Sequence, residues 1–72
     1  MTNTRIALEK LPINCMNAVE RYKSLYRQYK DNGNSALQCE SRIKAKGYLE
    51  ALTDAGIVTL TEQRLLFGYI TL

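Results

Sequence analysis

The residues of this chain best suited to chemistry are seven basic side chains between positions 21 and 46. Only Asp31 and Glu40 oppose them there, so this stretch carries a formal charge of +5, against +3 for the whole chain. Concentrated positive charge attracts phosphates or an acidic protein surface; the alternative is a solvated surface that keeps the protein in solution. The candidate anion- or partner-binding residues are Arg21, Lys23, Arg27, Lys30, Arg42, Lys44 and Lys46.

Three tyrosines, Tyr22, Tyr26 and Tyr29, alternate with these basic residues. Aromatic rings beside Lys and Arg can stack on nucleotides, and Tyr is favoured in binding hot spots. The same three positions also lie on a helical stripe that should face the core, where the rings would pack with their hydroxyls at the rim. The sequence leaves both roles open, so the three residues are candidate aromatic contacts.

Enzyme chemistry has little support in the composition. The chain has no His, which removes the commonest general base and metal ligand. It contains no Ser-His or Cys-His arrangement, no phosphate-binding P-loop and no glycine-rich dinucleotide motif. Two cysteines, Cys15 and Cys39, are too few for a metal site or a disulfide framework. We therefore expect a protein that is not an enzyme and that uses no cofactor and no metal.

The hydropathy pattern gives no sign of a membrane segment or an export signal. Residues 1–11 lack the apolar run of a secretory signal, and no stretch approaches the roughly 20 apolar residues that a membrane span needs. We expect a cytoplasmic protein with reduced cysteines and no membrane partner.

The elements that must position the basic residues are two helices. From Cys15 to Tyr29 the apolar residues recur at steps of four and three, which predicts a helix over 13–30. The polar turn 31–34 interrupts this period. Ser35 with Gln38 then fits a capping box, and a second helix is expected over 36–55, ended by a left-handed glycine at position 56. A connection this short makes the pair an antiparallel hairpin with its positive charge at one end.

Two further helices complete the expected fold. A short N-terminal helix is expected over 5–10, capped by Asn3 or Thr4, before Pro12. A single domain over residues 1–72 is then all-α: an antiparallel helical hairpin with a short N-terminal helix and a C-terminal helix. Gly47, inside the second long helix, is expected to allow close approach of another helix or a ligand.

The C-terminal helix has two possible starts. Thr59 with Glu62 fits a capping box, whereas Thr61 as the cap gives a hydrophobic staple between Leu60 and Leu65.

The end of the chain is crowded with apolar residues that one hairpin should not be able to cover. We therefore expect a homodimer through the last helix; the competing arrangement folds residues 65–72 between the hairpin and the N-terminal helix to complete a monomeric core. The candidate oligomer-interface residues are Phe67, Tyr69, Ile70 and Leu72.

The run from Gly47 to Ile57, followed by residues 59–62, resembles small orphan proteins of bacterial phages and mobile elements. That group includes inhibitors of host defence such as anti-CRISPR proteins. Many of these inhibitors are acidic DNA mimics, and this basic chain departs from that pattern. An inhibitor with this charge would bind RNA, DNA, a nucleotide signal or an acidic protein patch.

We accordingly expect a small non-enzymatic helical binding protein, an inhibitor of a host defence system. It would dock its basic, Tyr-rich hairpin onto a nucleic-acid-containing complex, a nucleotide or an acidic protein surface, and its partner would be a protein or a ribonucleoprotein. The first alternative is a small DNA- or RNA-binding regulator. The second is a structural subunit that oligomerises through its C-terminus.

Overall fold

The computed structural model describes residues 3–72, and every regular element among them is a helix. The helices are α1 (Asn3–Glu9), α2 (Ile13–Asp31), α3 (Ser35–Asp54) and α4 (Leu60–Ile70). This confirms the predicted all-α fold, a small helical bundle built on a hairpin. None of the helices in this part of the chain is long and apolar enough to cross a membrane.

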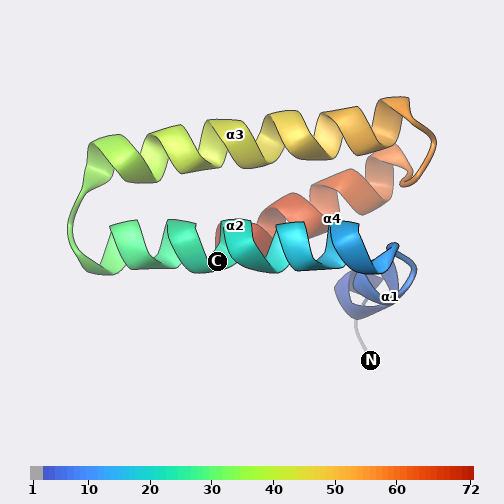
Figure 1. The fold of residues 1–72 in the computed structure, drawn as a ribbon, viewed down its shortest axis with the longest axis horizontal. Coiled ribbons are helices and arrows are strands. Elements are labelled where there is room, and N and C mark those ends of the chain that lie inside the picture. The colour runs from blue at the N-terminus through green and yellow to red at the C-terminus, as the bar shows by residue number, and fades with distance from the viewer. Residues whose placement is uncertain (1–2) are drawn as a thin grey trace.

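The long helices α2 and α3 lie side by side and antiparallel (Figure 1). In that view α4 crosses behind the hairpin and packs on both of its helices, and α1 packs on α4 near the start of α2. The hairpin extends beyond the end of α4, which gives the molecule dimensions of 33 × 26 × 20 Å.

Both long helices end in a left-handed glycine. Gly33 has φ 69° in the turn over 31–34, and Gly56 has φ 75° after α3. After Gly56, the backbone N–H of Ile57 donates to the carbonyl of Leu52 at 2.9 Å, the bond that defines a Schellman ending. The predicted glycine cap of α3 is therefore confirmed.

The start of α3 differs from the prediction by one residue. Asn34 is the N-cap, and its Oδ1 accepts a hydrogen bond from the Leu37 backbone N–H at 3.1 Å. Ser35 is already helical, so the Ser35–Gln38 capping box is wrong. Asn34 has the non-helical backbone (φ −90°, ψ 83°) that an N-cap needs, and Gln38 donates instead to the Tyr26 hydroxyl.

The structure also tests the caps that were expected for α1 and α4. Thr59 and Glu62 form the capping box of α4: the Glu62 N–H donates to Thr59 Oγ1 at 3.1 Å and the Thr59 N–H to Glu62 Oε1 at 2.8 Å. Thr61 lies inside the helix, which rules out the alternative start. Asn3 and Thr4 lie within α1, so neither caps it as expected.

The buried apolar residues all lie outside residues 24–42, and all but Ala18 form one cluster. We call residues 24–42 the arm and residues 3–23 with 43–72 the body. In the arm the only buried residue is Ser41, whose hydroxyl donates to the Gln38 carbonyl at 2.8 Å. The buried hydrophobic residues of the body are Ala7, Leu11, Ala18, Val19, Ala45, Leu49, Leu52, Val58, Leu66 and Ile70.

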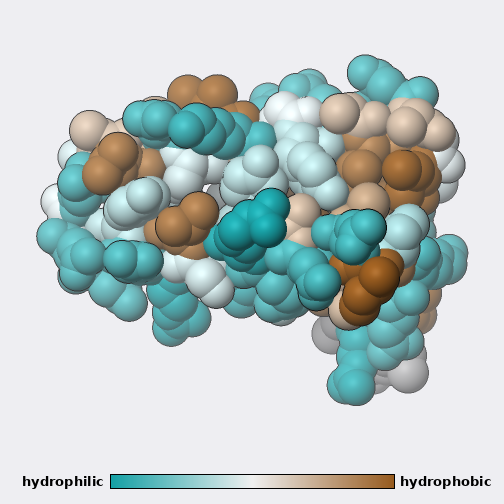
Figure 2. Space-filling model, viewed as in Figure 1, coloured by the Kyte–Doolittle hydropathy of each residue, from teal (hydrophilic) through white to brown (hydrophobic). Residues whose placement is uncertain are grey.

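Figure 2 shows the side of the hairpin that α4 does not cover. Its surface also differs between the arm and the body. Apolar patches on the arm are isolated among hydrophilic atoms, whereas apolar surface gathers at the end where α3 leads into α4. Gly47 is exposed, and a Cβ there would meet nothing within 4 Å. The close approach of another helix within the described fold is therefore wrong, and the approach of a ligand or of a partner's helix at Gly47 stays a prediction.

Candidate anion-binding face

The seven basic residues singled out in the sequence divide between two sides of the hairpin. Contacts with α4 identify one side directly, because α4 packs on a single face formed by α2 and α3. Five of the seven lie on this side, and a sixth cation from α4 joins them.

The stripe on α2 begins at Lys23. Its Nζ donates to the Tyr69 carbonyl at 2.8 Å and lies 4.1 Å from the centroid of the Tyr69 ring. Arg27 and Lys30 follow four and seven residues later, so they lie on the same side of α2. Both are exposed. Because α4 ends at Ile70, it covers Lys23 and leaves Arg27 and Lys30 open on the arm.

The stripe on α3 begins at Arg42. Its guanidinium carbon lies 5.4 Å from the centroid of the Phe67 ring on α4. Lys46 lies one turn further along α3 and lines a depression of about 340 Å³ together with Arg64 of α4. We call these six residues the basic face: Lys23, Arg27, Lys30, Arg42, Lys46 and Arg64.

Arg64 was missed from the sequence. It lies outside the 21–46 stretch and reaches Lys46 only because α4 folds back against α3. The periodicity of α4 places Arg64 one turn after Leu60, but that spacing does not show which helix lies beside it.

The remaining two basic residues, Arg21 and Lys44, lie away from the basic face. Arg21 precedes Lys23 by two positions, which turns it about 200° around α2. Lys44 Nζ forms an ion pair with Glu40 Oε1 at 3.0 Å. The hydrogen bond and charge of Glu40 raise the pKa of Lys44.

No carboxylate in residues 3–72 forms an ion pair with the basic face. Glu20 Oε1 accepts the Tyr69 hydroxyl at 2.7 Å, and Glu62 is held by Lys10 at 3.4 Å. The hydrogen bond from the Thr59 N–H, followed by the neighbouring Lys10, lowers the pKa of Glu62. Glu50 is exposed on α3, one turn after Lys46. The face therefore keeps a positive charge that an external anion can neutralise.

The three tyrosines lie half-buried between the hairpin helices. The rings of Tyr22 and Tyr48 are tilted at 43° with centroids 5.5 Å apart. The hydroxyl of Tyr26 accepts a hydrogen bond from Gln38 Nε2 at 3.1 Å. Tyr29 and Tyr22 line a small depression of about 70 Å³ between the helices. The Tyr26–Gln38 bond joins the helices in the arm, and the Tyr22–Tyr48 contact joins them in the adjoining part of the body. A contact with a partner stays a prediction for all three.

The C-terminal residues are largely covered within one chain. Ile70 is 1% exposed, and Phe67 and Tyr69 pack against the core. Leu72 is 68% exposed. This is the arrangement of the monomeric alternative, in which the last helix completes the core, and the homodimer stays a prediction.

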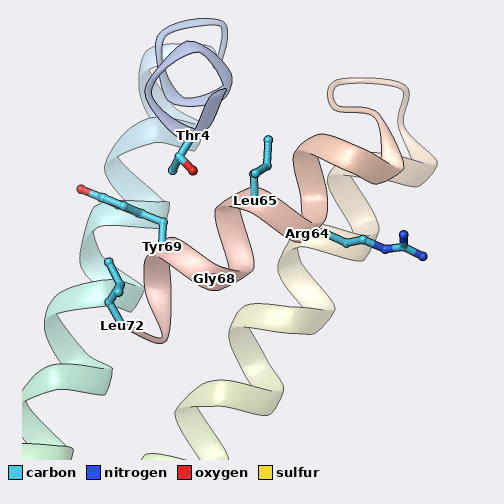
Figure 3. Close-up of a pocket in the computed structure, with 6 residues that line it drawn as sticks. All are labelled: Thr4, Arg64, Leu65, Gly68, Tyr69 and Leu72. Atoms are coloured by element: carbon cyan, nitrogen blue, oxygen red, sulfur yellow. The ribbon is translucent and has the colours of Figure 1, made fainter. Parts of the chain in front are cut away.

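Leu72 borders a depression of about 440 Å³ on the side of α4 nearer α1. Figure 3 shows Leu65 rising from α4 on the side of α1 and Thr4, whereas Arg64 extends away from Thr4, over α3. Arg64 therefore stands between this depression and the one that it lines with Lys46. The residues of the larger depression are Thr4, Arg64, Leu65, Gly68, Tyr69 and Leu72.

No family model, curated protein or solved structure matches this chain.

Proposed function

We propose that this protein is a small non-enzymatic binding protein whose basic face docks on the phosphates of a nucleic acid, free or within a nucleoprotein complex. The observation that carries the proposal is the convergence of six cations from three helices on one face, none of them ion-paired within residues 3–72. Lys and Arg that neutralise phosphates release condensed counterions, which supplies most of the affinity of sequence-independent binding.

The shape of the hairpin supports this role. Arg27 and Lys30 lie beyond the end of α4, so the arm can approach a partner without interference from the body. The resemblance to phage inhibitors of host defence suggests a setting, since a defence complex built on nucleic acid offers phosphates at its surface. In that setting the protein would act by occupying the surface, with no chemical step.

Salt dependence is the first test. Binding of a fluorescent oligonucleotide is followed by anisotropy over a series of salt concentrations. If all six cations contact phosphates, the slope of log affinity against log salt is roughly −4 to −5. Absence of nucleic-acid binding at low salt would contradict the proposal and leave an acidic protein surface as the partner.

Charge reversal locates the surface. The double variant Arg27→Glu with Lys46→Glu should weaken binding about a hundredfold at about 0.1 M salt, because two phosphate contacts are lost. The control Arg21→Glu with Lys44→Glu changes net charge by the same amount on the other side and should weaken binding much less. Both variants should melt close to the parent, since exposed charges contribute about 0–1 kcal/mol. Equal losses in the two variants would mean that only net charge matters.

A second proposal concerns self-association through α4. Leu72 is exposed beside the depression that Leu65 and Gly68 line, and a second copy could cover this surface. Light scattering at micromolar concentration decides: a mass of two chains supports the homodimer, and a mass of one chain leaves the monomeric bundle.

A further inference from the structure

The depression shared by Lys46 and Arg64 combines two kinds of surface. We call it the α3–α4 groove; with a volume of about 340 Å³ it falls in the size range of small-ligand sites. Cations stand on both of its sides, Lys46 on α3 and Arg64 on α4. Its other lining residues are Leu60, Gln63 and Phe67.

The apolar part of the groove is open to a ligand. Leu60 is 53% exposed, and the half-buried Phe67 ring lies beneath the Arg42 guanidinium. The Gln63 amide is fixed in place, because its Oε1 accepts the Thr53 hydroxyl at 2.7 Å. A simple phosphate would neutralise the cations but would leave the exposed side chain of Leu60 in water.

We propose that the α3–α4 groove accepts one unstacked nucleotide of a single-stranded nucleic acid. Lys46 and Arg64 hold its phosphate, and the base lies against Leu60 and Phe67, with the Arg42 guanidinium beside the Phe67 ring. Aromatic and guanidinium planes are the surfaces on which unstacked bases settle. This inference rests on the proposed function, and it adds a preference for single strands.

A duplex cannot fill the groove in the same way. Its bases are stacked and paired, so only phosphates reach the protein, and the contact with Leu60 is lost. Each base that stacks on an aromatic side chain strengthens single-strand binding about fivefold or more. The basic face alone would not favour a single strand, because a duplex has the higher phosphate density.

The first experiment compares an oligothymidylate with a duplex of the same length by anisotropy. We expect the single strand to bind at least about fivefold more tightly. Leu60→Ser should lower single-strand affinity by about that factor and leave duplex affinity unchanged, since no charge is altered. The matched control is Ile43→Ser, which removes a 64% exposed apolar side chain from α3 and should change neither affinity. Equal effects of the two variants would overturn the inference.

The second experiment observes the groove directly. Phe67 is the one phenylalanine of the chain, so fluorinated phenylalanine gives a single fluorine NMR signal from this ring. We expect the signal to shift further with oligothymidylate than with inorganic phosphate or the duplex, because only the single strand places a base beside the Phe67 ring. An unchanged signal with saturating single strand overturns the groove assignment while salt-dependent binding still supports the basic face. Failure of both nucleic acids to bind overturns the groove and the proposed function together.

Discussion

The arm and the body share the two long helices α2 and α3, yet different contacts join these helices in each. In the body, Leu49 of α3 and Leu66 of α4 are fully buried, and α4 fills the space against the hairpin. In the arm, the helices meet through half-buried tyrosines and the Gln38–Tyr26 hydrogen bond. The difference indicates that the body supplies most of the stability, because burial of apolar surface is the dominant favourable term in folding.

Charges follow this division only in part, because Lys46 and Arg64 of the body are exposed and form no ion pair among residues 3–72. Lys10 of the body pairs with Glu62, and Lys23 at the boundary is held by Tyr69. Arg27 and Lys30 of the arm have no acceptor among the residues that the structure describes. The arm has no buried apolar core, so its cations stay in water and no desolvation penalty arises. The arm is therefore suited to binding together with the α3–α4 groove, and the rest of the body holds both in place.

Cavity-forming substitutions should show the contrast most strongly. Leu49→Ala in the body should lower the free energy of unfolding by about 2–5 kcal/mol, because Leu49 is fully buried. Leu25→Ala in the arm removes a half-buried side chain and should have an effect of about 1 kcal/mol. Chemical denaturation measures both, and equal losses would show that the arm is as tightly packed as the body.

Alkaline pH should weaken the body through two tyrosines. The hydrogen bond to Glu20, then burial, raises the pKa of Tyr69 to about 12, and burial, then the hydrogen bond with Cys15, raises the pKa of Tyr48 to about 12. Because these pKa values lie above the unfolded value of 10.0, the stabilisation is complete below pH 10 and is lost as pH rises toward 12.

Denaturant midpoints across this range measure the loss, and ultraviolet absorbance follows tyrosine ionisation. In Glu20→Gln, Tyr69 should ionise at lower pH, because the carboxylate no longer opposes the phenolate. A midpoint that stays constant up to pH 12 would contradict the assignment.

The two glycines with positive φ, Gly33 and Gly56, test the same difference in stability between arm and body, with a smaller expected loss. Gly56→Ala in the body should lower stability by about 1–2 kcal/mol, because a Cβ strains a residue at positive φ. Gly33→Ala introduces similar strain at the tip of the arm. If the arm opens locally, thermal or chemical unfolding should report a smaller loss for Gly33→Ala. Identical losses would indicate that arm and body unfold together.

The smallest change is expected at Gly47. Its φ is not positive and a Cβ would meet no atom within 4 Å, so Gly47→Ala should raise stability by up to about 1 kcal/mol through helix propensity. A thermal melt checks this. A lower melting temperature would reveal a close contact at this position that the structure does not contain.

The hairpin was predictable because its signals are local. Apolar spacing located α2, Gly56 marked where α3 ends, and the start of α4 was narrowed to Thr59 or Thr61, of which the structure shows Thr59. The cap of α3 was misplaced because Asn34 and Ser35 are both good N-caps, and only the backbone geometry after Gly33 decides between them.

The site was predicted less completely. The sequence placed the basic residues on one hairpin but could not divide them by side, because that division depends on where α4 packs. Arg64 joins Lys46 across two helices, and Lys44 is neutralised by Glu40 one turn away. Both outcomes depend on side-chain placement, which helical periodicity does not specify.

Backbone hydrogen exchange tests most directly whether the body supplies the stability while the arm and the α3–α4 groove supply the binding surface. In the free protein, amides of residues 24–41 should exchange through local opening, well before those of residues 45–52 and 63–70, which lie in the packed body. With a bound single-stranded oligonucleotide, protection should rise chiefly in the arm and along the α3–α4 groove. Uniform protection in the free protein, or an arm whose exchange does not change on binding, would contradict the account.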